Sequence, residues 1–133
     1  RDLPNRAARA QAEVVLLDQP PIADGPAQRL VFCDMPCSGS GVWRRDPSGK
    51  WTLTAARLRD LQNLQSEILA QASALVAAGG LLLYATCSVL KRENSDQIDS
   101  FTAENPSWSC RESKQFLPSN QGDGFYYAVL KKD

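Results

Sequence analysis

The chain has 133 residues, of which 43% are hydrophobic and 23% charged, a composition that suits one globular domain with a modest core. Its 15 basic and 15 acidic side chains leave a formal net charge of zero, so a nucleic-acid ligand would need a local basic surface. No run approaches the ~20 apolar residues of a membrane span and no secretory signal begins the chain, so we expect a cytoplasmic protein.

The first part of the chain is predicted to hold a helix end and two strands. Residues 2–11 are rich in Arg and Ala, which is typical of the end of a helix, and residues 13–18 form an apolar run that predicts a strand ending in an acid. Prolines and glycines make residues 19–28 a loop. Residues 31–34 predict a buried strand, which Pro36 and the following glycines terminate.

The middle of the chain is predicted to form a loop, a long helix and a strand. Residues 42–51 mix aromatic and basic side chains and are expected to be a loop. Apolar residues at helical spacing then predict a helix that Thr54 caps and that runs to about Ala78, with Gly79-Gly80 as its carboxyl cap. Residues 81–85 predict the next strand.

The last part is predicted to add a short helix and two strands. Asn94 is expected to cap the helix, and Asn105-Pro106 ends it. Strands are expected at residues 107–112 and 125–130, with a turn at 121–124 between them. The order of elements predicts an α/β sheet, and because no helix separates the last two strands, one of them is expected to run antiparallel.

The residue types restrict the chemistry that this chain can perform. It has no histidine, which excludes a Ser-His-Asp or Cys-His site built from its own residues. No pair of its four cysteines has Cys-x2-Cys or Cys-x4-Cys spacing, so we expect no metal site. Without a secretory signal, the thiols are expected to be reduced.

Two predicted strands are each followed by a cysteine and a serine. Asp34 ends the strand at 31–34 and Cys37 follows it, and Cys87 follows the strand at 81–85. The carboxyl ends of strands border the ligand crevice in open α/β sheets, which makes these residues candidates for a site. The alternative is that both cysteines are small buried residues at strand ends. The loop 37–41 meets none of the dinucleotide, P-loop or phosphatase patterns.

Three motifs together resemble one known family. Asp-Met-Pro-Cys-Ser-Gly-Ser-Gly at 34–41, Ala-Thr-Cys-Ser-Val-Leu at 85–90 and Glu93-Asn94 resemble the Sun family of RNA cytosine-5 methyltransferases. The similarity covers roughly residues 13–132, and among bacterial members it looks closest to the small-subunit ribosomal RNA enzymes. It implies a class I methyltransferase-like, Rossmann-like α/β sheet with an antiparallel final strand, truncated at the amino end. Residues 1–133 would form the carboxyl-terminal part of one catalytic domain.

The resemblance also implies a reaction. Carbon 5 of cytosine is a poor nucleophile toward the methyl group of S-adenosylmethionine, and a thiolate that adds to carbon 6 activates it. By resemblance, Cys87 is the nucleophile, Cys37 assists product release and Asp34 contacts cytosine N3. The substrate is implied to be ribosomal RNA.

The resemblance further implies binding residues. Asp18, Asp34 and Pro36 are expected to contact the cofactor. The RNA is expected to lie on a basic segment, residues 44–60, with contacts from Arg44, Arg45, Lys50 and Trp51. The alternatives are that this segment is an ordinary solvated surface and that Asp18 caps a loop.

Two other functions stay open from the sequence. The chain would be a non-enzymatic half-domain if it keeps the RNA-binding surface but lacks a complete cofactor site. A thiol-dependent enzyme of another class is disfavoured, because the chain has no histidine and the loop patterns fail.

Overall fold

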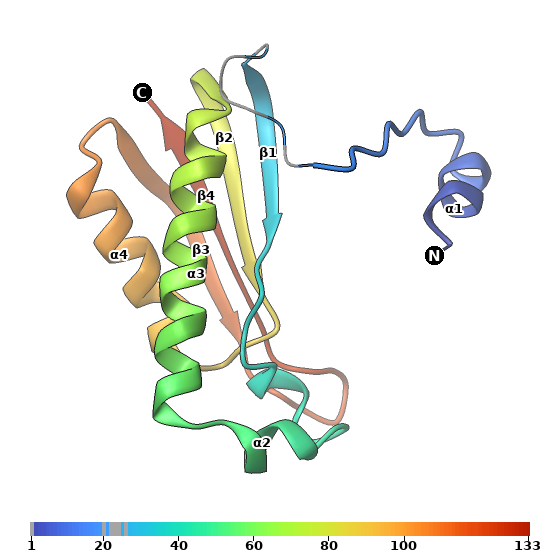
Figure 1. The fold of residues 1–133 in the computed structure, drawn as a ribbon, viewed down its shortest axis with the longest axis vertical. Coiled ribbons are helices and arrows are strands. Elements are labelled where there is room, and N and C mark those ends of the chain that lie inside the picture. The colour runs from blue at the N-terminus through green and yellow to red at the C-terminus, as the bar shows by residue number, and fades with distance from the viewer. Residues whose placement is uncertain (1, 20, 22–24, 26) are drawn as a thin grey trace.

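The computed structural model describes residues 2–19, 21, 25 and 27–133, which include a mixed four-stranded sheet with the two longer helices on one face (Figure 1). The strands are β1 (Gln28–Asp34), β2 (Val76–Thr86), β3 (Trp108–Phe116) and β4 (Phe125–Lys132), in the sheet order β1-β2-β4-β3. The helices are α1 (Leu3–Arg9), α2 (Ser48–Thr52), α3 (Ala55–Ala74) and α4 (Ser95–Glu104), with short 3-10 turns η1 (Ser40–Val42) and η2 (Lys91–Glu93).

The strand directions confirm the predicted α/β sheet with an antiparallel final strand. β1 and β2 are parallel, with α3 connecting them, whereas β4 is antiparallel to both β2 and β3. A parallel pair needs such a crossover, and an antiparallel pair can be joined by a short turn. The predicted strand at 107–112 extends to Phe116 because it pairs with β4 along this whole length.

The core lies between the sheet and the two longer helices, α3 and α4. Alternation along β2 buries Leu82 and Tyr84 on the helix-covered face, where they meet Leu69 of α3 and Ile98 of α4. On α4 and β3, Phe101 and Trp108 pack edge to face with ring centroids 5.6 Å apart. This packing holds the sheet against α3 and α4 and so determines the positions of the ends of β1 and β2.

The long helix begins as predicted and ends earlier. The side chain of Thr54 accepts a hydrogen bond from the backbone N–H of Arg57, which confirms the cap. The predictions that the helix reaches Ala78 and that Gly79-Gly80 caps it were wrong. The register between β1 and β2 shifts at this point, and Gly79 adopts a φ of +73° inside β2. The two glycines therefore lie at an irregularity of β2, where the positive φ of Gly79 favours glycine.

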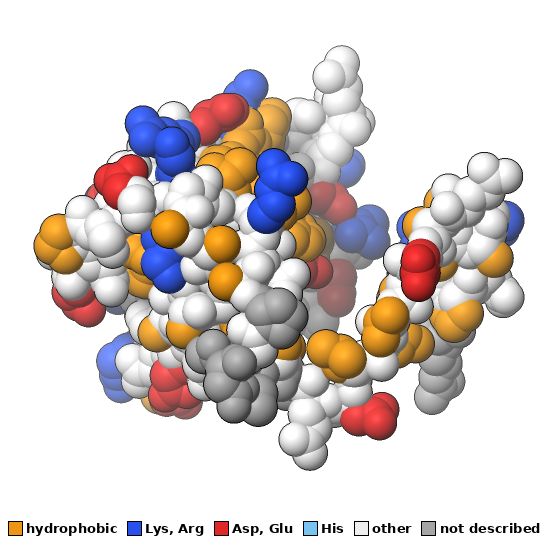
Figure 2. All heavy atoms as spheres, turned by 90° about the horizontal axis from the view of Figure 1, so that it is seen from above, with side chains coloured by type: hydrophobic (Ala, Val, Ile, Leu, Met, Phe, Trp, Pro, Cys, Tyr) orange, Lys and Arg blue, Asp and Glu red, His pale blue; other side chains and the backbone are white. Residues whose placement is uncertain are grey.

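The predicted strand at residues 13–18 is absent. These residues have no regular structure and are exposed, including Val15, Leu16 and Leu17. A strand requires a neighbour that accepts its backbone hydrogen bonds, and this segment runs away from the sheet toward α1 (Figure 1). The space-filling view also shows α1 standing apart from the body of the molecule (Figure 2).

Two further local predictions were wrong. Residues 42–51, expected to be a loop, include the end of η1 and most of the short helix α2. Asn94 stands at the start of α4, but its side chain makes no capping hydrogen bond. It bonds instead to the end of β2, because the hydroxyl of Thr86 donates to its side-chain oxygen at 2.7 Å. No helix in the described part of the chain has the length and apolar character needed to span a membrane.

Candidate active site

Cys37 and Cys87 meet at the end of the two parallel strands. Asp34 of β1 pairs with Ala85 of β2, and the ladder continues when the N–H of Met35 donates to the Ala85 carbonyl at 2.9 Å. Both strands therefore end at the same level of the sheet. The Sγ atoms of Cys37 and Cys87 lie 3.4 Å apart, and both residues are half-buried. The structure brings together the two cysteines that the sequence singled out.

A buried carboxyl group connects the two cysteine loops. Glu93, at the end of η2, has no solvent exposure. Its side chain accepts hydrogen bonds from the backbone N–H of Ser38 at 2.8 Å, from the Ser38 hydroxyl at 2.6 Å and from the Ser88 hydroxyl at 2.6 Å. The amide of Gln65 on α3 donates to it at 3.2 Å. Ser38 and Ser88 are the residues directly after Cys37 and Cys87.

Additional buried hydrogen bonds hold the same loops. The hydroxyls of Ser40 and Ser88 are 2.9 Å apart, and the N–H of Val89 donates to Ser40 Oγ at 2.9 Å. The side-chain amide of Asn94 donates to the Ser88 carbonyl at 2.9 Å. Buried polar groups need such partners, so the loops are fixed by hydrogen bonds rather than by apolar packing.

Two glycines fasten the cysteine loop to the start of β4. The N–H of Gly41 donates to the carbonyl of Cys87, and the N–H of Gly124 donates to the carbonyl of Gly41, each at 2.9 Å. A Cβ atom at Gly41 would lie 2.2 Å from the Gly124 oxygen. This close backbone approach requires glycine and brings the 118–124 turn to the edge of the site.

The environment keeps Cys37 as a neutral thiol. Burial, reinforced by the neighbouring Cys87 thiol, raises the pKa of Cys37 from its ordinary value of 9.0 to about 12. At neutral pH Cys37 therefore carries its proton and is suited to donate it.

The raised pKa predicts slow alkylation of Cys37. At pH 8 a thiol with a pKa of 9.0 is about one-tenth thiolate, whereas a pKa of about 12 leaves about one in 10⁴. Because the thiolate of the less acidic thiol is also the better nucleophile, we expect iodoacetamide to react at least about 30-fold more slowly with Cys37 in the folded chain than in urea. The same pKa difference makes the free energy of unfolding depend on pH. Because the pKa of Cys37 is higher in the folded chain, the stabilisation linked to its protonated thiol is fully present below pH 9 and is lost as the pH rises toward about 12. Peptide-resolved mass spectrometry gives the rates, and equal rates in the folded and unfolded chain would contradict this environment.

The structure places two of the three expected cofactor-binding residues next to the cysteines. Asp34 is the exposed last residue of β1, and Pro36 is exposed beside Cys37. The Pro36 carbonyl accepts a hydrogen bond from Gln65 at 2.8 Å, which fixes the backbone before Cys37. Asp18 is exposed and lies in the segment without regular structure between α1 and β1.

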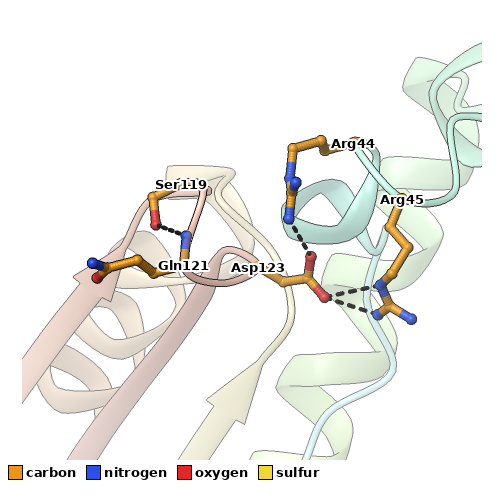
Figure 3. Close-up of polar contacts among 5 residues, drawn as sticks. All are labelled: Arg44, Arg45, Ser119, Gln121 and Asp123. Atoms are coloured by element: carbon orange, nitrogen blue, oxygen red, sulfur yellow. Dashed lines mark hydrogen bonds and ion pairs between the residues drawn. The ribbon is translucent and has the colours of Figure 1, made fainter.

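The basic segment begins directly after the cysteine loop. Arg44 and Arg45 follow η1 and both face Asp123, which lies in the turn before β4 (Figure 3). Arg45 forms an ion pair of 2.8 Å with Asp123, and Arg44 approaches it at 4.0 Å. Both guanidinium groups remain largely exposed, so a phosphate could reach them in competition with Asp123.

The aromatic residues of this segment differ in exposure. Trp51 on α2 is 81% exposed, and the ammonium group of Lys50 lies 5.7 Å from its ring centroid. Trp43 is half-buried against Gly49, and its ring nitrogen has no hydrogen-bond partner among the described residues. Trp51 is therefore the residue that can stack on a base, whereas Trp43 supports the loop.

The sequence reasoning missed the supporting residues of the site. Glu93 belongs to the Glu93-Asn94 motif but was expected to have no role of its own, and no local pattern related Gln65 or Asp123 to the site. A Glu with Asn directly after it, placed six residues beyond a strand-end cysteine, was the available signal. Its contact with Ser38 spans 55 residues, so only the fold shows it.

Solved structures show the class of fold. The crystal structure of PH0851 matches with a TM-score of 0.75 and 32% identity over 78% of this chain and 26% of that one. NSun6 from Pyrococcus horikoshii, solved with SFG, matches with a TM-score of 0.78 and 20% identity over 98% of this chain and 38% of that one. The fold is the class I methyltransferase-like α/β sheet.

The sequence comparisons show the family. The family model described as 16S rRNA methyltransferase RsmB/F matches residues 5–131, and the chain belongs to this family. Ribosomal RNA small subunit methyltransferase B of Proteus mirabilis is 41% identical over 103 residues, and that of Sodalis glossinidius is 40% identical over 134 residues. The chain spans 24% and 31% of the lengths of these two relatives.

Proposed function

We propose that this chain carries the cysteine site for transfer of a methyl group from S-adenosylmethionine to carbon 5 of a cytosine in ribosomal RNA. The observation that carries the proposal is the pair of thiols, 3.4 Å apart, at the ends of two parallel strands. The names of the relatives support ribosomal RNA as the substrate, and the neighbour solved with SFG, an S-adenosylmethionine analogue, supports the cofactor.

The proposed reaction assigns a different task to each thiol. The Cys87 thiolate forms a bond to carbon 6 of the cytosine, which makes carbon 5 nucleophilic. When bound, S-adenosylmethionine supplies the methyl group that carbon 5 takes up. A base then removes the proton from carbon 5, the bond between sulfur and carbon 6 breaks, and the electron pair returns to Cys87. The neutral Cys37 thiol assists this release, which agrees with its raised pKa.

Two exposed residues near Cys37 are proposed to bind the cytosine and the cofactor. Asp34 would hold the cytosine edge at N3, and together with Pro36 it would contact the cofactor. Both residues lie within three positions of Cys37 in the chain and are exposed, which fits this role. Asp18 is proposed as a third cofactor contact on the resemblance to the family, with the segment 13–18 placed differently when ligand is bound.

Replacing Cys37 by alanine is expected to trap the RNA. Without the release thiol, the bond between Cys87 and carbon 6 should persist, so a complex of protein and RNA should survive denaturing electrophoresis. Cys110→Ala is the matched control, because Cys110 is exposed on β3 and far along the chain from either cysteine loop. Normal turnover by the Cys37 variant, with no stable complex, would refute the release role.

The basic segment is proposed as the RNA-binding surface, with Arg44, Arg45, Lys50 and Trp51 as contacts. Asp123 competes with phosphate for the two arginines. We therefore expect Asp123→Asn to raise affinity for single-stranded RNA by about three- to tenfold at low salt, and the salt dependence to become steeper as freed arginines contact phosphates.

Fluorescence anisotropy with a labelled RNA from the small ribosomal subunit tests this at several salt concentrations. Glu67→Gln is the control, because it removes one negative charge from the exposed face of α3. Equal affinity gains in both variants would show a general charge effect. Salt-independent binding would contradict phosphate recognition.

The second candidate is a non-enzymatic half-domain that binds RNA. The observation that favours it is that the segment 13–18, which carries Asp18, has no regular structure and is exposed. We propose that residues 1–133 correspond to the carboxyl-terminal part of one catalytic domain and that the protein acts in the cytoplasm. Calorimetric titration with S-adenosylmethionine distinguishes the candidates, since micromolar binding by this chain would favour the enzyme and no binding would favour the half-domain.

A further inference from the structure

We propose that Glu93 is the positioning residue that holds the thiols of Cys37 and Cys87 face to face. The importance of this arrangement for methyl transfer rests on the proposed function above. The arrangement itself is a property of this chain and can be measured without RNA or cofactor.

The argument begins with the contacts of the Glu93 carboxyl group. Oε1 accepts from the Ser38 N–H and from the Gln65 amide, and Oε2 accepts from the hydroxyls of Ser38 and Ser88. One side chain thus binds the residue after Cys37 and the residue after Cys87. Each loop is fixed relative to the same two oxygen atoms, and through them to the other loop.

The burial of Glu93 indicates that the group has a specific task. Acids are almost never fully buried unless paired, yet no Lys or Arg in the described part of the chain forms an ion pair with Glu93. Its stabilisation comes from four hydrogen bonds, and three of them originate in the cysteine loops. A carboxyl group that served packing alone would be replaceable by an apolar side chain.

The Glu93 carboxyl group is also linked to the helix layer. Gln65 of α3 donates to this carboxyl group and also to the Pro36 carbonyl. The backbone carbonyl of Glu93 separately accepts a hydrogen bond from the hydroxyl of the buried Tyr84 at 2.6 Å, a contact that does not involve the carboxyl group. The carboxyl group is therefore tied to α3 as well as to the two cysteine loops.

Disulfide formation reports how closely the two thiols are held together. In a glutathione buffer, one cysteine thiolate attacks oxidised glutathione and releases one glutathione thiol, and the other cysteine then displaces the second glutathione. Two protein thiols are oxidised and one glutathione disulfide is reduced. The equilibrium ratio gives the effective concentration of one thiol relative to the other. The 133-residue chain with Cys110→Ser is used, so that the exposed Cys110 does not interfere.

If the Glu93 carboxyl group positions the two thiols, two matched variants should differ in the effective concentration. We expect an effective concentration on the order of 1 M or higher for the parent chain, and a decrease of at least about tenfold for Glu93→Gln, because small misplacements of reacting groups are costly. Tyr84→Phe is the control, since it removes a buried hydrogen bond to the backbone of the same residue and leaves the carboxyl group in place. It should change the value by less than about twofold. Circular dichroism establishes that each variant is folded.

Each outcome decides the proposal. No intramolecular disulfide in the parent chain, or equal values for the parent and Glu93→Gln, would overturn it. Equal decreases in Glu93→Gln and Tyr84→Phe would show a general loss of structure instead of positioning. If Glu93→Gln does not fold, Ser38→Ala and Ser88→Ala each remove one hydroxyl donor, and unchanged values in both would overturn the proposal.

The failure of the proposed function would be distinguishable from the failure of this inference. If the parent protein transfers no methyl group while its thiols form the disulfide in a Glu93-dependent manner, the inference holds and the function fails. If methyl transfer occurs, Glu93→Gln should lower kcat and leave KM for RNA within about twofold, because the RNA-binding segment is unchanged.

Discussion

Replacing Cys87 by alanine is expected to abolish methyl transfer. The proposed reaction depends on a bond between this sulfur and carbon 6, and burial raises the pKa of the neighbouring Cys37 thiol, which disfavours it as a replacement nucleophile. Loss of a covalent nucleophile lowers kcat by a factor on the order of 10⁴ or more. The measurement is transfer of labelled methyl groups from S-adenosylmethionine to small-subunit ribosomal RNA by the full-length protein.

The control for this experiment is Cys110→Ala. Cys110 lies exposed on β3 and should be replaceable without loss of activity. A Cys87→Ala protein that is folded and retains methyl transfer within about tenfold of the parent would remove Cys87 from the nucleophile role, because a nucleophile contributes far more than this.

Replacing Gly41 by alanine is expected to destabilise the chain by about 3 kcal/mol, the upper part of the usual range for overpacking. The new methyl group would lie 2.2 Å from the Gly124 oxygen and 2.8 Å from the Cys87 oxygen. Both atoms belong to the backbone, and both segments are held by hydrogen bonds to Gly41 itself, so neither can move without breaking the connection between the cysteine loop and β4.

Urea unfolding of the 133-residue chain followed by circular dichroism tests the Gly41 prediction. Gly122→Ala is the matched control, because a Cβ atom there has no neighbour within 4 Å and φ is not in the left-handed region. We expect a change of less than about 0.5 kcal/mol for the control. Equal stability of the two variants would show that the close approach at Gly41 is not maintained in solution.

The meeting of the two cysteines could be predicted from the sequence because local signals specify it. Each cysteine follows an apolar run, and Pro36 and the glycines after Cys37 mark the end of the first run. Strands that end in this way expose their next residues at the edge of the sheet. The parallel pairing that aligns both ends depends on the crossover through α3, which the helical spacing of the apolar residues also indicated.

The supporting parts of the site could not be predicted because they depend on contacts between distant residues. Asp123 meets Arg45 across 78 residues, and Glu93 meets Ser38 across 55. Local patterns failed where the tertiary environment decides the outcome. The run at 13–18 has the composition of a strand but no strand beside it, and Gly79-Gly80 resembles a helix cap but lies within β2.

The most direct test of the central claim is to identify the cysteine that bonds to RNA. The Cys37→Ala protein is incubated with ribosomal RNA and S-adenosylmethionine, digested with ribonuclease and protease, and analysed by mass spectrometry. The account predicts a methylated cytidine nucleotide attached to the peptide that contains Cys87, and to no other cysteine. A nucleotide attached to Cys33 or Cys110, or quantitative methylation without any covalent peptide, would contradict it.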